Sequence, residues 1–328
     1  MTILLELLVF FLKISIIVIA ALLLVAGIAA ILSKGKENTK GKIRIKNLNK
    51  KYEALKSELQ EKLLSKNDYK KLSKQEKKSQ KKADKARNKK RIFVLDFDGD
   101  IKAHAVNGLR EQVTAILTVA KPSDEVLLRL DSGGGVVHGY GLAASQLARI
   151  KDKNIPLTVA VDKVAASGGY MMACVADKII AAPFAIIGSI GAVLQLPNIH
   201  RFLKKHNIEF EQLTAGQFKR TLSVFGENTS KGRAKAQEEL EEIHELFKTF
   251  ITSNRAQIDI EKVATGEHWP ASRAKELNLV DALQTSDDYL FCAHPDAEIY
   301  ELQYQEKHSL MDKLFGKVQS LVHRNIYF

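Results

Sequence analysis

The chain has 328 residues and a formal net charge of +12, from 50 Lys and Arg against 38 Asp and Glu. Its hydrophobic fraction of 45% and charged fraction of 27% are those of an ordinary folded protein, which excludes collagen-like and wholly disordered classes. The two cysteines, Cys174 and Cys292, exclude a disulfide framework and a zinc site with the usual cysteine spacing.

The positive charge is concentrated in one segment. Residues 34–91 hold 23 Lys and Arg but 7 Asp and Glu, whereas residues 92–328 hold 26 basic and 30 acidic side chains. A basic domain would suggest nucleic acid as a partner. Because the chain beyond residue 91 is mildly acidic, we expect no nucleic-acid partner.

The first predicted element is a membrane anchor. Residues 14–32 (ISIIVIAALLLVAGIAAIL) carry no charge, and a run of this length spans a bilayer as a helix. The alternative is a cleaved signal peptide. However, the preceding residues contain Glu6 and no basic segment, and the run exceeds the usual apolar core of about 7–15 residues. We therefore expect residues 1–33 to be a transmembrane anchor.

A lysine-rich stem follows at 34–91. It contains no proline, and its residues 48–64 (LNKKYEALKSELQEKLL) have apolar positions at helical spacing. Blocks of like charge favour a solvated stalk, helical or partly disordered, which also attracts anionic lipid. Because the basic residues begin directly after the apolar run, the positive-inside rule places the C-terminal side of the chain in the cytoplasm.

From residue 92, short apolar runs alternate with amphipathic helical patterns. Four runs are typical of buried strands: 92–97, 126–130, 157–161 and 178–182. Helical spacing occupies 107–120, 136–151 and 167–177. This βαβα order predicts an α/β domain, over residues 92–290, with a mostly parallel sheet covered by helices.

Two further amphipathic segments are predicted. Residues 228–257 form a long helix, with Asn228, Thr229 or Ser230 as its N-cap. A C-terminal tail, 291–328, contains the second segment at 309–323 (SLMDKLFGKVQSLVH). Its mixed charge favours a helix docked on the domain over contact with a membrane.

The segment 157–175 (LTVAVDKVAASGGYMMACV) presents a candidate nucleophile. Ser167 ends a predicted strand and precedes Gly168, Gly169 and an apolar helix. A hydroxyl at a helix N-terminus lies beside free backbone N–H groups that stabilise a developing anion. The simpler interpretation is a serine that caps the helix, and this segment alone favours it.

A second strand, 126–130, leads into a glycine-rich loop at 131–136 (DSGGGV) before the next helix. Such a loop exposes backbone N–H groups. A phosphate-binding loop is the alternative, but no Gly-Lys-Ser/Thr follows and the dinucleotide-binding spacing is absent. An oxyanion hole fits better if a nucleophile lies nearby.

A hydroxyl nucleophile needs a general base. None of the nine histidines has a persuasive setting, whereas Lys219 follows a predicted strand in a small, apolar context (TAGQFKRT, 214–221). A lysine acts as a base when burial lowers its pKa from about 10.4 toward 7–8. Considered alone, Lys219 is also an ordinary loop lysine.

Four motifs in this order and spacing resemble the signal peptide peptidase A family of serine peptidases: the loop 131–135, AASGGYMMA around Ser167, GSIGA at 188–192 and AGQFKR around Lys219. The anchor and basic stem resemble the SohB-type membrane branch of that family. The similarity covers about residues 91–285.

The resemblance implies a ClpP/crotonase-like fold of repeated ββα units and a Ser/Lys dyad. Ser167 would be the nucleophile and Lys219 the general base. Gly134 and Gly168 would lend backbone N–H groups to the oxyanion hole, and Ser189 would hydrogen-bond the lysine. The family also implies peptide substrates, no metal or organic cofactor, and a homo-oligomer in which neighbouring protomers complete each active site.

One departure from the family pattern lies in the loop. The family usually has Ser-Pro-Gly-Gly, whereas Gly133 replaces the proline here. Loss of proline makes the unbound loop less rigid, so we expect an oxyanion hole that is less preorganised.

Two other functions stay open on the sequence. Asp96 and Asp98 (VLDFDGD, 94–100) resemble the acidic motif of magnesium-dependent phosphatases of the haloacid-dehalogenase type, and Asp287 and Asp288 are candidates for the distant acidic pair. A non-catalytic membrane adaptor with a crotonase-like fold is the second alternative, because fold alone does not decide function.

The resemblance also bears on location. It implies a single-pass protein of a bacterial-type inner membrane. The charge rule places the catalytic domain in the cytoplasm, whereas a role in clearing membrane-embedded peptides places it on the other side. We favour the charge rule only slightly, because long domains translocate regardless of charge.

Overall fold

The computed structural model describes Ser15, Val18, Ile19, residues 41–85 and residues 89–305. Of these, Ile45–Gln303 form one compact unit, whereas residues up to Arg44 and from Tyr304 onward belong to a second. The predicted anchor at 14–32, apart from three residues, and the predicted tail helix at 309–323 lie outside the described residues. Among the residues that the structure does describe, no helix is long and apolar enough to cross a membrane.

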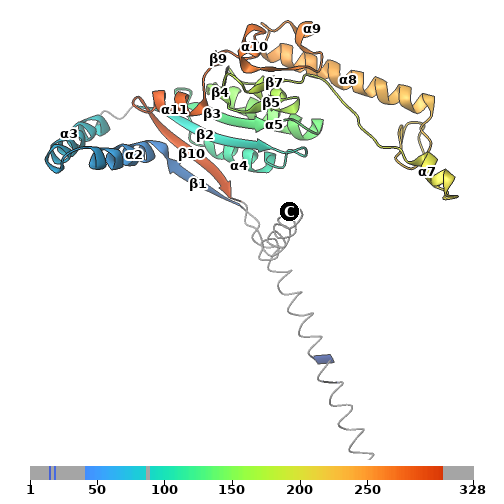
Figure 1. Ribbon diagram of the computed structural model, residues 1–328, viewed down its shortest axis with the longest axis horizontal. Helices are drawn as coiled ribbons and strands as arrows, with labels where there is room; N and C mark the ends of the chain where they lie inside the picture. The colour runs from blue at the N-terminus through green and yellow to red at the C-terminus, as the bar shows by residue number, and fades with distance from the viewer. Residues whose placement is uncertain (1–14, 16–17, 20–40, 86–88, 306–328) are drawn as a thin grey trace, which may run out of the picture. The chain divides into compact units, whose positions relative to one another are not determined.

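A ten-stranded sheet organises the described chain (Figure 1). Its strands are β1 (Lys42–Asn47), β2 (Lys90–Gly99), β3 (Glu125–Ser132), β4 (Leu157–Val161), β5 (Val164–Ala166), β6 (Lys178–Ala181), β7 (Ile186–Gly188), β8 (His268–Pro270), β9 (Ala282–Leu283) and β10 (Ala297–Gln305). The main path runs β1-β10-β2-β3-β4-β6-β9, and β5, β7 and β8 branch from β3. From β10 to β9 every pair on the main path is parallel, as are the pairs of β3 with β5 and of β5 with β7, whereas β7 and β8 pair antiparallel.

The predicted α/β class and mostly parallel sheet are therefore confirmed. The four predicted strands correspond to β2, β3, β4 and β6. All five residues of β4 are buried, because other parts of the chain cover both faces of the sheet at this strand. Such strands have continuous apolar sequences, which is why they were recognisable without the structure.

Helices connect and cover the strands. They are α2 (Leu48–Leu63), α3 (Lys66–Lys85), α4 (Val106–Leu117), α5 (Val137–Lys151), α6 (Gly168–Ala173), α7 (His200–Lys205), α8 (Ser230–Asn254), α9 (Ile260–Val263), α10 (Ala271–Glu276) and α11 (Ser286–Ala293). The long helix α8 begins as predicted, with Thr229 as its N-cap: the Thr229 hydroxyl accepts a hydrogen bond from the Gly232 N–H at 3.1 Å.

The core has two layers because β2 alternates its side chains between the two faces of the sheet. On one face Phe97 meets Tyr140 of α5 edge to face, with ring centroids 6.3 Å apart. On the other face Ile92 and Val94 lie in a cluster with Leu290 of α11 and Leu48 of α2. The first residue of α2 is thus part of the core, whereas the rest of the helix is largely exposed.

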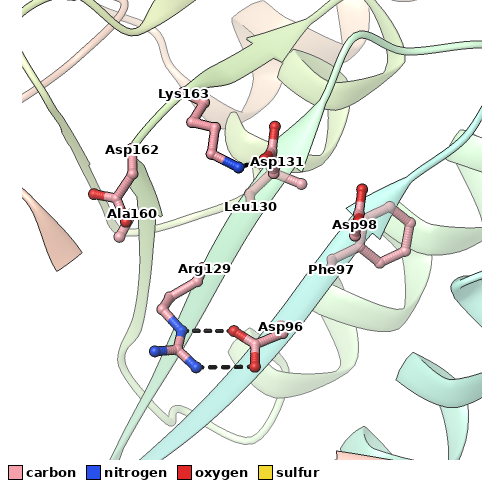
Figure 2. Close-up of a pocket in the computed structure, with 9 residues that line it drawn as sticks. All are labelled: Asp96, Phe97, Asp98, Arg129, Leu130, Asp131, Ala160, Asp162 and Lys163. Atoms are coloured by element: carbon pink, nitrogen blue, oxygen red, sulfur yellow. Dashed lines mark hydrogen bonds and ion pairs between the residues drawn. The ribbon is translucent and has the colours of Figure 1, made fainter. Parts of the chain in front are cut away.

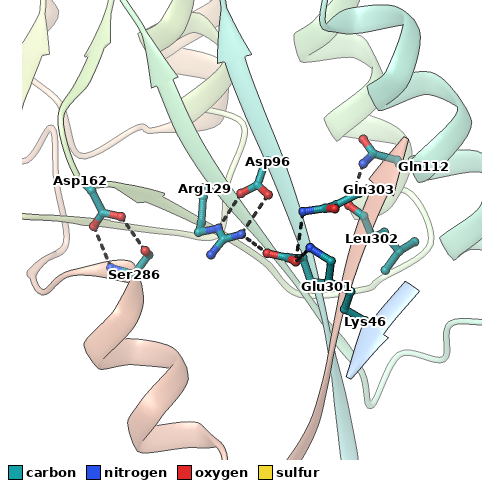
Figure 3. Close-up of polar contacts among 9 residues, drawn as sticks. All are labelled: Lys46, Asp96, Gln112, Arg129, Asp162, Ser286, Glu301, Leu302 and Gln303. Carbon is teal, nitrogen blue, oxygen red and sulfur yellow. Dashed lines mark hydrogen bonds and ion pairs between the residues drawn. The ribbon is translucent and has the colours of Figure 1, made fainter. Parts of the chain in front are cut away.

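Two strands lie outside the boundaries 92–290 expected from the sequence. β1 forms within the predicted stem, and β10 within the predicted tail. A charged network holds β10 in the sheet (Figure 3): Arg129 of β3 donates to Asp96 of β2 at 2.5 and 2.9 Å and to Glu301 of β10 at 2.5 Å. Lys46 of β1 pairs with Glu301 at 3.3 Å.

Residues 189–229 form an arm between β7 and α8. Figure 1 shows this segment leaving the sheet after β7 and reaching α7 at the far end of α8. Apart from α7, residues 191–229 form no helix or strand. The strand predicted directly before Lys219 is therefore absent, and long α8 returns the chain to the sheet.

Candidate active site

Ser167 occupies the turn between β5 and α6 in a strained conformation. Its φ of 52° and ψ of −120° are unfavourable for any residue with a side chain, and such strain concentrates at functional sites. The Ser167 N–H donates to the Gly188 carbonyl at 2.8 Å, and the Ser167 carbonyl accepts from the Met171 N–H at 3.0 Å. These backbone bonds hold the turn in place.

The Ser167 hydroxyl does not cap the helix. No side-chain capping bond exists at this N-cap position, and among the described residues the hydroxyl has no hydrogen-bond partner. The capping interpretation left open by the sequence is therefore wrong for this serine. A free hydroxyl on a strained turn at a helix N-terminus is available for chemistry.

The glycine-rich loop lies directly against this turn. Gly134 has a φ of +87°, and a Cβ added to it would lie 2.7 Å from Ser167 Cβ and 2.7 Å from Gly168 N. Only a glycine allows so close an approach with this backbone conformation. The structure thus brings Gly134, Ser167 and Gly168 together, as the resemblance requires.

The two candidate N–H donors differ in their present partners. Gly168 N–H is at the first position of α6 and has no acceptor among the described residues. Gly134 N–H donates to the hydroxyl oxygen of Ser132 at 3.1 Å. The sequence analysis did not identify Ser132, or Tyr140, which lies in hydrogen-bond contact with it, as part of the site. The only sequence feature that points to Ser132 is its position in the glycine-rich loop.

Ser189 follows the last residue of β7, the strand that pairs with β5. β5 pairs with β7 so that Ala166 is opposite Gly188, which places Ser189 and Ser167 at the same edge of the branch. Ser189 also has a positive φ, 53°, and its N–H donates to the Glu267 carbonyl at 2.6 Å. Two strained serines therefore follow adjacent parallel strands.

Lys219 lies elsewhere, in the exposed loop of the arm. Its loop is anchored on the first turns of α8: the Phe218 ring lies under the ammonium groups of Lys231 and Lys235, at 5.6 and 5.7 Å. A Cβ on Gly232 would collide with the Thr221 carbonyl, so this glycine lets the loop approach the helix. Within the described chain, no hydrogen bond or ion pair joins Lys219 to Ser167.

The acidic motif that resembles a phosphatase motif lines a cavity that does not include Ser167 (Figure 2). This cavity, of about 210 Å³, contains Asp96, Asp98 and Asp131. Both oxygens of Asp96 accept hydrogen bonds from Arg129, and Asp131 pairs with Lys163 at 2.8 Å. A nucleophilic carboxylate would need a free oxygen. The structure therefore gives Asp96 a structural role in the network that joins β2, β3 and β10.

The predicted distant acidic pair has no catalytic setting either. Asp287 and Asp288 lie in the first turn of α11, where Asp288 N–H donates to the Thr285 hydroxyl at 3.2 Å. Asp288 also accepts from Gln284 at 2.7 Å. In the part of the chain that the structure describes, no three His, Cys, Asp or Glu side chains form a group able to hold a metal ion.

Comparison with known proteins identifies the family of this sequence. The model for "Peptidase family S49 N-terminal" matches residues 2–147, and the model for "Peptidase family S49" matches residues 149–299. "Probable protease SohB" of Haemophilus influenzae is 59% identical over 229 residues, which cover 70% of this chain and 65% of that protein. The chain therefore spans just under two thirds of this relative.

Another relative extends over nearly the whole chain. "Putative protease SohB" of Buchnera aphidicola subsp. Baizongia pistaciae is 42% identical over 327 residues, 95% of this chain and 94% of that protein. Among solved structures, a membrane-bound stomatin-specific protease in complex with a substrate peptide is 15% identical, with a TM-score of 0.42. That match covers 71% of this chain and 99% of the other.

Proposed function

Because the chain belongs to peptidase family S49, we propose that it is a membrane-anchored serine peptidase in which Ser167 is the nucleophile and Lys219 the general base. The observation that carries this proposal is Ser167, whose backbone is strained, whose hydroxyl has no partner within the described chain, and whose Cβ lies against Gly134. The fold supports a ClpP/crotonase-like architecture, because β4, β5 and α6 form one ββα unit and β6 and β7 repeat its two strands.

The reaction follows from the groups around Ser167. The neutral amine of Lys219 takes the Ser167 proton while the serine oxygen attacks a peptide carbonyl carbon. The carbonyl oxygen becomes an anion, held by the N–H groups of Gly168 and Gly134. The ammonium of Lys219 then protonates the leaving amine as the C–N bond breaks. Water, activated by the same lysine, hydrolyses the acyl-serine and restores the free hydroxyl.

The Gly134 N–H binds this oxyanion by sharing its hydrogen between the oxyanion and the Ser132 hydroxyl oxygen. Its present bond to Ser132 Oγ is 3.1 Å long, and both partners are neutral. A charged acceptor binds an N–H about twice as strongly as a neutral one. The arriving oxyanion therefore competes well with the serine oxygen, and Gly133 in place of proline gives the loop freedom to adjust.

The position of Lys219 supports a dyad shared between protomers. Its loop is fixed on the first turns of α8, and within the described chain no hydrogen bond or ion pair joins Lys219 to Ser167 of the same chain. The arm also exposes large apolar side chains, among them Val193 (78% exposed), Phe202 (61%) and Leu213 (96%). Surfaces of this kind mark interfaces. We propose that the arm of one protomer delivers Lys219 to Ser167 of its neighbour in a homo-oligomer, where the neighbour's Ser189, beside that Ser167, hydrogen-bonds the lysine.

The expected substrates are peptides or membrane-derived protein fragments, including remnants of signal peptides. The apolar segment 14–32 and the basic stem would attach the enzyme to an inner membrane and its anionic lipids. The catalytic chemistry uses no cofactor. A purely adaptor role would leave the free, strained hydroxyl of Ser167 without a purpose.

The test is a peptidase assay on the full-length protein with peptides that have small or apolar residues at the cleavage site. We expect Ser167→Ala and Lys219→Ala to fold and to lose at least about 1,000-fold in kcat, since each removes a group that acts in the reaction. Ser145→Ala on α5 and Lys205→Ala on α7 are the exposed control variants. Wild-type cleavage by the Ser167 or Lys219 variant would refute the proposed dyad.

A further inference from the structure

A buried tyrosine lies beneath the nucleophile turn. Tyr140 of α5 has no exposed surface. A Cβ added to Gly168 would collide with the Cγ and Cβ atoms of Tyr140, so the backbone of Gly168 sits directly on this side chain. Tyr140 thereby supports the residue whose N–H is one of the two proposed oxyanion donors.

The Tyr140 hydroxyl reaches the second donor through Ser132. It donates to the Asp100 carbonyl at 2.8 Å and lies 2.6 Å from the Ser132 hydroxyl oxygen. Because the tyrosine proton goes to the Asp100 carbonyl, the Ser132 hydroxyl donates to the tyrosine oxygen, with a longer contact of 3.3 Å to the Gly99 carbonyl. The Ser132 oxygen then accepts the Gly134 N–H. One chain of hydrogen bonds, all in one direction, runs from Gly134 to Asp100.

The hydroxyls of Ser132 and Tyr140 in this chain have little room to rearrange. Ser132 is 2% exposed, and a Cβ added to Gly99 would collide with the hydroxyl oxygens of both Ser132 and Tyr140. Burial raises the pKa of Tyr140, although the bond to Ser132 opposes this, so the hydroxyl keeps its proton at neutral pH. A closely packed and fully paired network of this kind fixes the geometry of the groups at its ends.

We propose that Tyr140 is a positioning residue of the oxyanion hole, supporting the Gly168 amide with its ring and orienting the Gly134 peptide through Ser132. The inference rests on the proposed function, because it assigns Tyr140 to the donors of that same reaction. Tyr140 acts through the backbone and does not touch the reacting atoms.

The test compares two buried tyrosines in the full-length protein. Tyr140→Phe keeps the ring under Gly168 and removes the hydroxyl. Tyr170→Phe is the matched control: Tyr170 is equally buried, in α6, and its hydroxyl donates to the Leu279 carbonyl at 3.0 Å, unconnected to the loop. We expect Tyr140→Phe to lower kcat about 10- to 100-fold, somewhat less than loss of an oxyanion donor. KM should stay within about twofold, and Tyr170→Phe should stay within about twofold in both constants.

A peptide aldehyde distinguishes positioning from general destabilisation. Its adduct with a catalytic serine carries an oxyanion, whereas the matching peptide alcohol forms none. For Tyr140→Phe, inhibition by the aldehyde should weaken by about the same factor as kcat, and inhibition by the alcohol should not change. Ser132→Ala should have the same effect, and the double variant should be no worse than either single one, because both break one chain.

The outcomes separate this inference from the proposed function. If Ser167→Ala is inactive but Tyr140→Phe and Ser132→Ala match Tyr170→Phe in kcat and in aldehyde inhibition, the positioning role is refuted and the peptidase remains. Equal weakening by aldehyde and alcohol would also refute it. If Ser167→Ala keeps wild-type activity, the proposed function itself fails.

Discussion

Gly133 and Gly134 are neighbours in one loop, but only Gly133 has room for a side chain. A Cβ on Gly133 meets nothing within 4 Å, and its φ is not positive, whereas Gly134 has a φ of +87° and contacts Ser167. The sequence alone shows two equivalent glycines. The sequence predicted the Ser167 hydroxyl, the glycine-rich loop at 131–136 and their order along the chain. It did not predict the contacts of Ser132 and Tyr140, because nothing local to either residue indicates a hydrogen bond between a strand end and a helix.

At this scale we expect opposite results from two alanine substitutions. Gly134→Ala should lower kcat at least about 100-fold, because the Cβ displaces one oxyanion donor, and should destabilise the fold by roughly 1–2 kcal/mol through its backbone conformation. Gly133→Ala should leave kcat within about twofold and stabilise the fold by about 0.4–1 kcal/mol, by restricting the unfolded chain. Kinetics and urea unfolding of both variants check this. Equal activity of the two would contradict the assigned loop geometry.

At the scale of elements, α8 is fixed at the end that meets the sheet. Arg255 follows α8 directly, is 2% exposed, and donates to Asp281 at 2.9 and 2.8 Å and to the Asn278 carbonyl at 3.1 Å. Asp281 also accepts the Ile179 N–H of β6 at 2.6 Å. This ion pair, in which the Arg255 side chain is buried and the Asp281 side chain is 32% exposed, joins the helix that supports the arm to the central sheet.

Removal of the Asp281 charge should therefore be costly. Asp281→Asn leaves the buried Arg255 without its counter-ion, and because Asp281 itself is partly exposed we expect the free energy of unfolding to fall by about 1–3 kcal/mol. The control is Glu238→Gln, which removes the exposed partner of Lys235 and should cost about 0–1 kcal/mol. Urea unfolding of the purified full-length protein measures both. A loss for Asp281→Asn no larger than that of the control would show that the pair does not anchor α8.

The same pair predicts a dependence on pH. Burial alone would raise the pKa of Asp281, but the hydrogen bonds and charge of Arg255 and the Ile179 N–H outweigh it and lower the pKa. A carboxylate with a lowered folded-state pKa contributes its full stability above its unfolded pKa, about 3.9, and loses it as the pH falls through the folded value. The stability difference between wild type and Asp281→Asn should therefore be constant near neutral pH and shrink below about pH 4. A difference that grows on acidification would contradict this assignment.

At the scale of the whole molecule, the parts differ in how far the sequence predicts them. The buried strands β3 and β4 were predictable because their apolar runs are continuous. β1 and β10 were not, because they carry the charges of Lys46 and Glu301, which become favourable in the sheet only when Glu301 pairs with both Lys46 and Arg129. Lys219 was predictable as a residue in a motif, but its place in the arm, outside the turn between β5 and α6 that carries Ser167, does not follow from any local pattern.

If the protomers assemble so that neighbours share active sites, two inactive variants should complement each other. Ser167→Ala and Lys219→Ala should each be inactive alone, but co-expressed subunits should recover about a quarter of wild-type activity if each site takes its serine and lysine from adjacent protomers of a ring. The measurement is peptidase activity of co-purified mixed oligomers carrying two different tags. Mixed oligomers that form and stay inactive would show that serine and lysine act within one chain.

Covalent trapping tests the assignment of Ser167 as the nucleophile. A fluorophosphonate probe reacts with an activated serine hydroxyl, and peptide mapping by mass spectrometry then locates the adduct. We expect the adduct on Ser167 of the full-length protein, no labelling of Ser167→Ala, and strongly slowed labelling of Lys219→Ala. An adduct on another serine, or equal labelling of wild type and Ser167→Ala, would show that Ser167 is not the nucleophile.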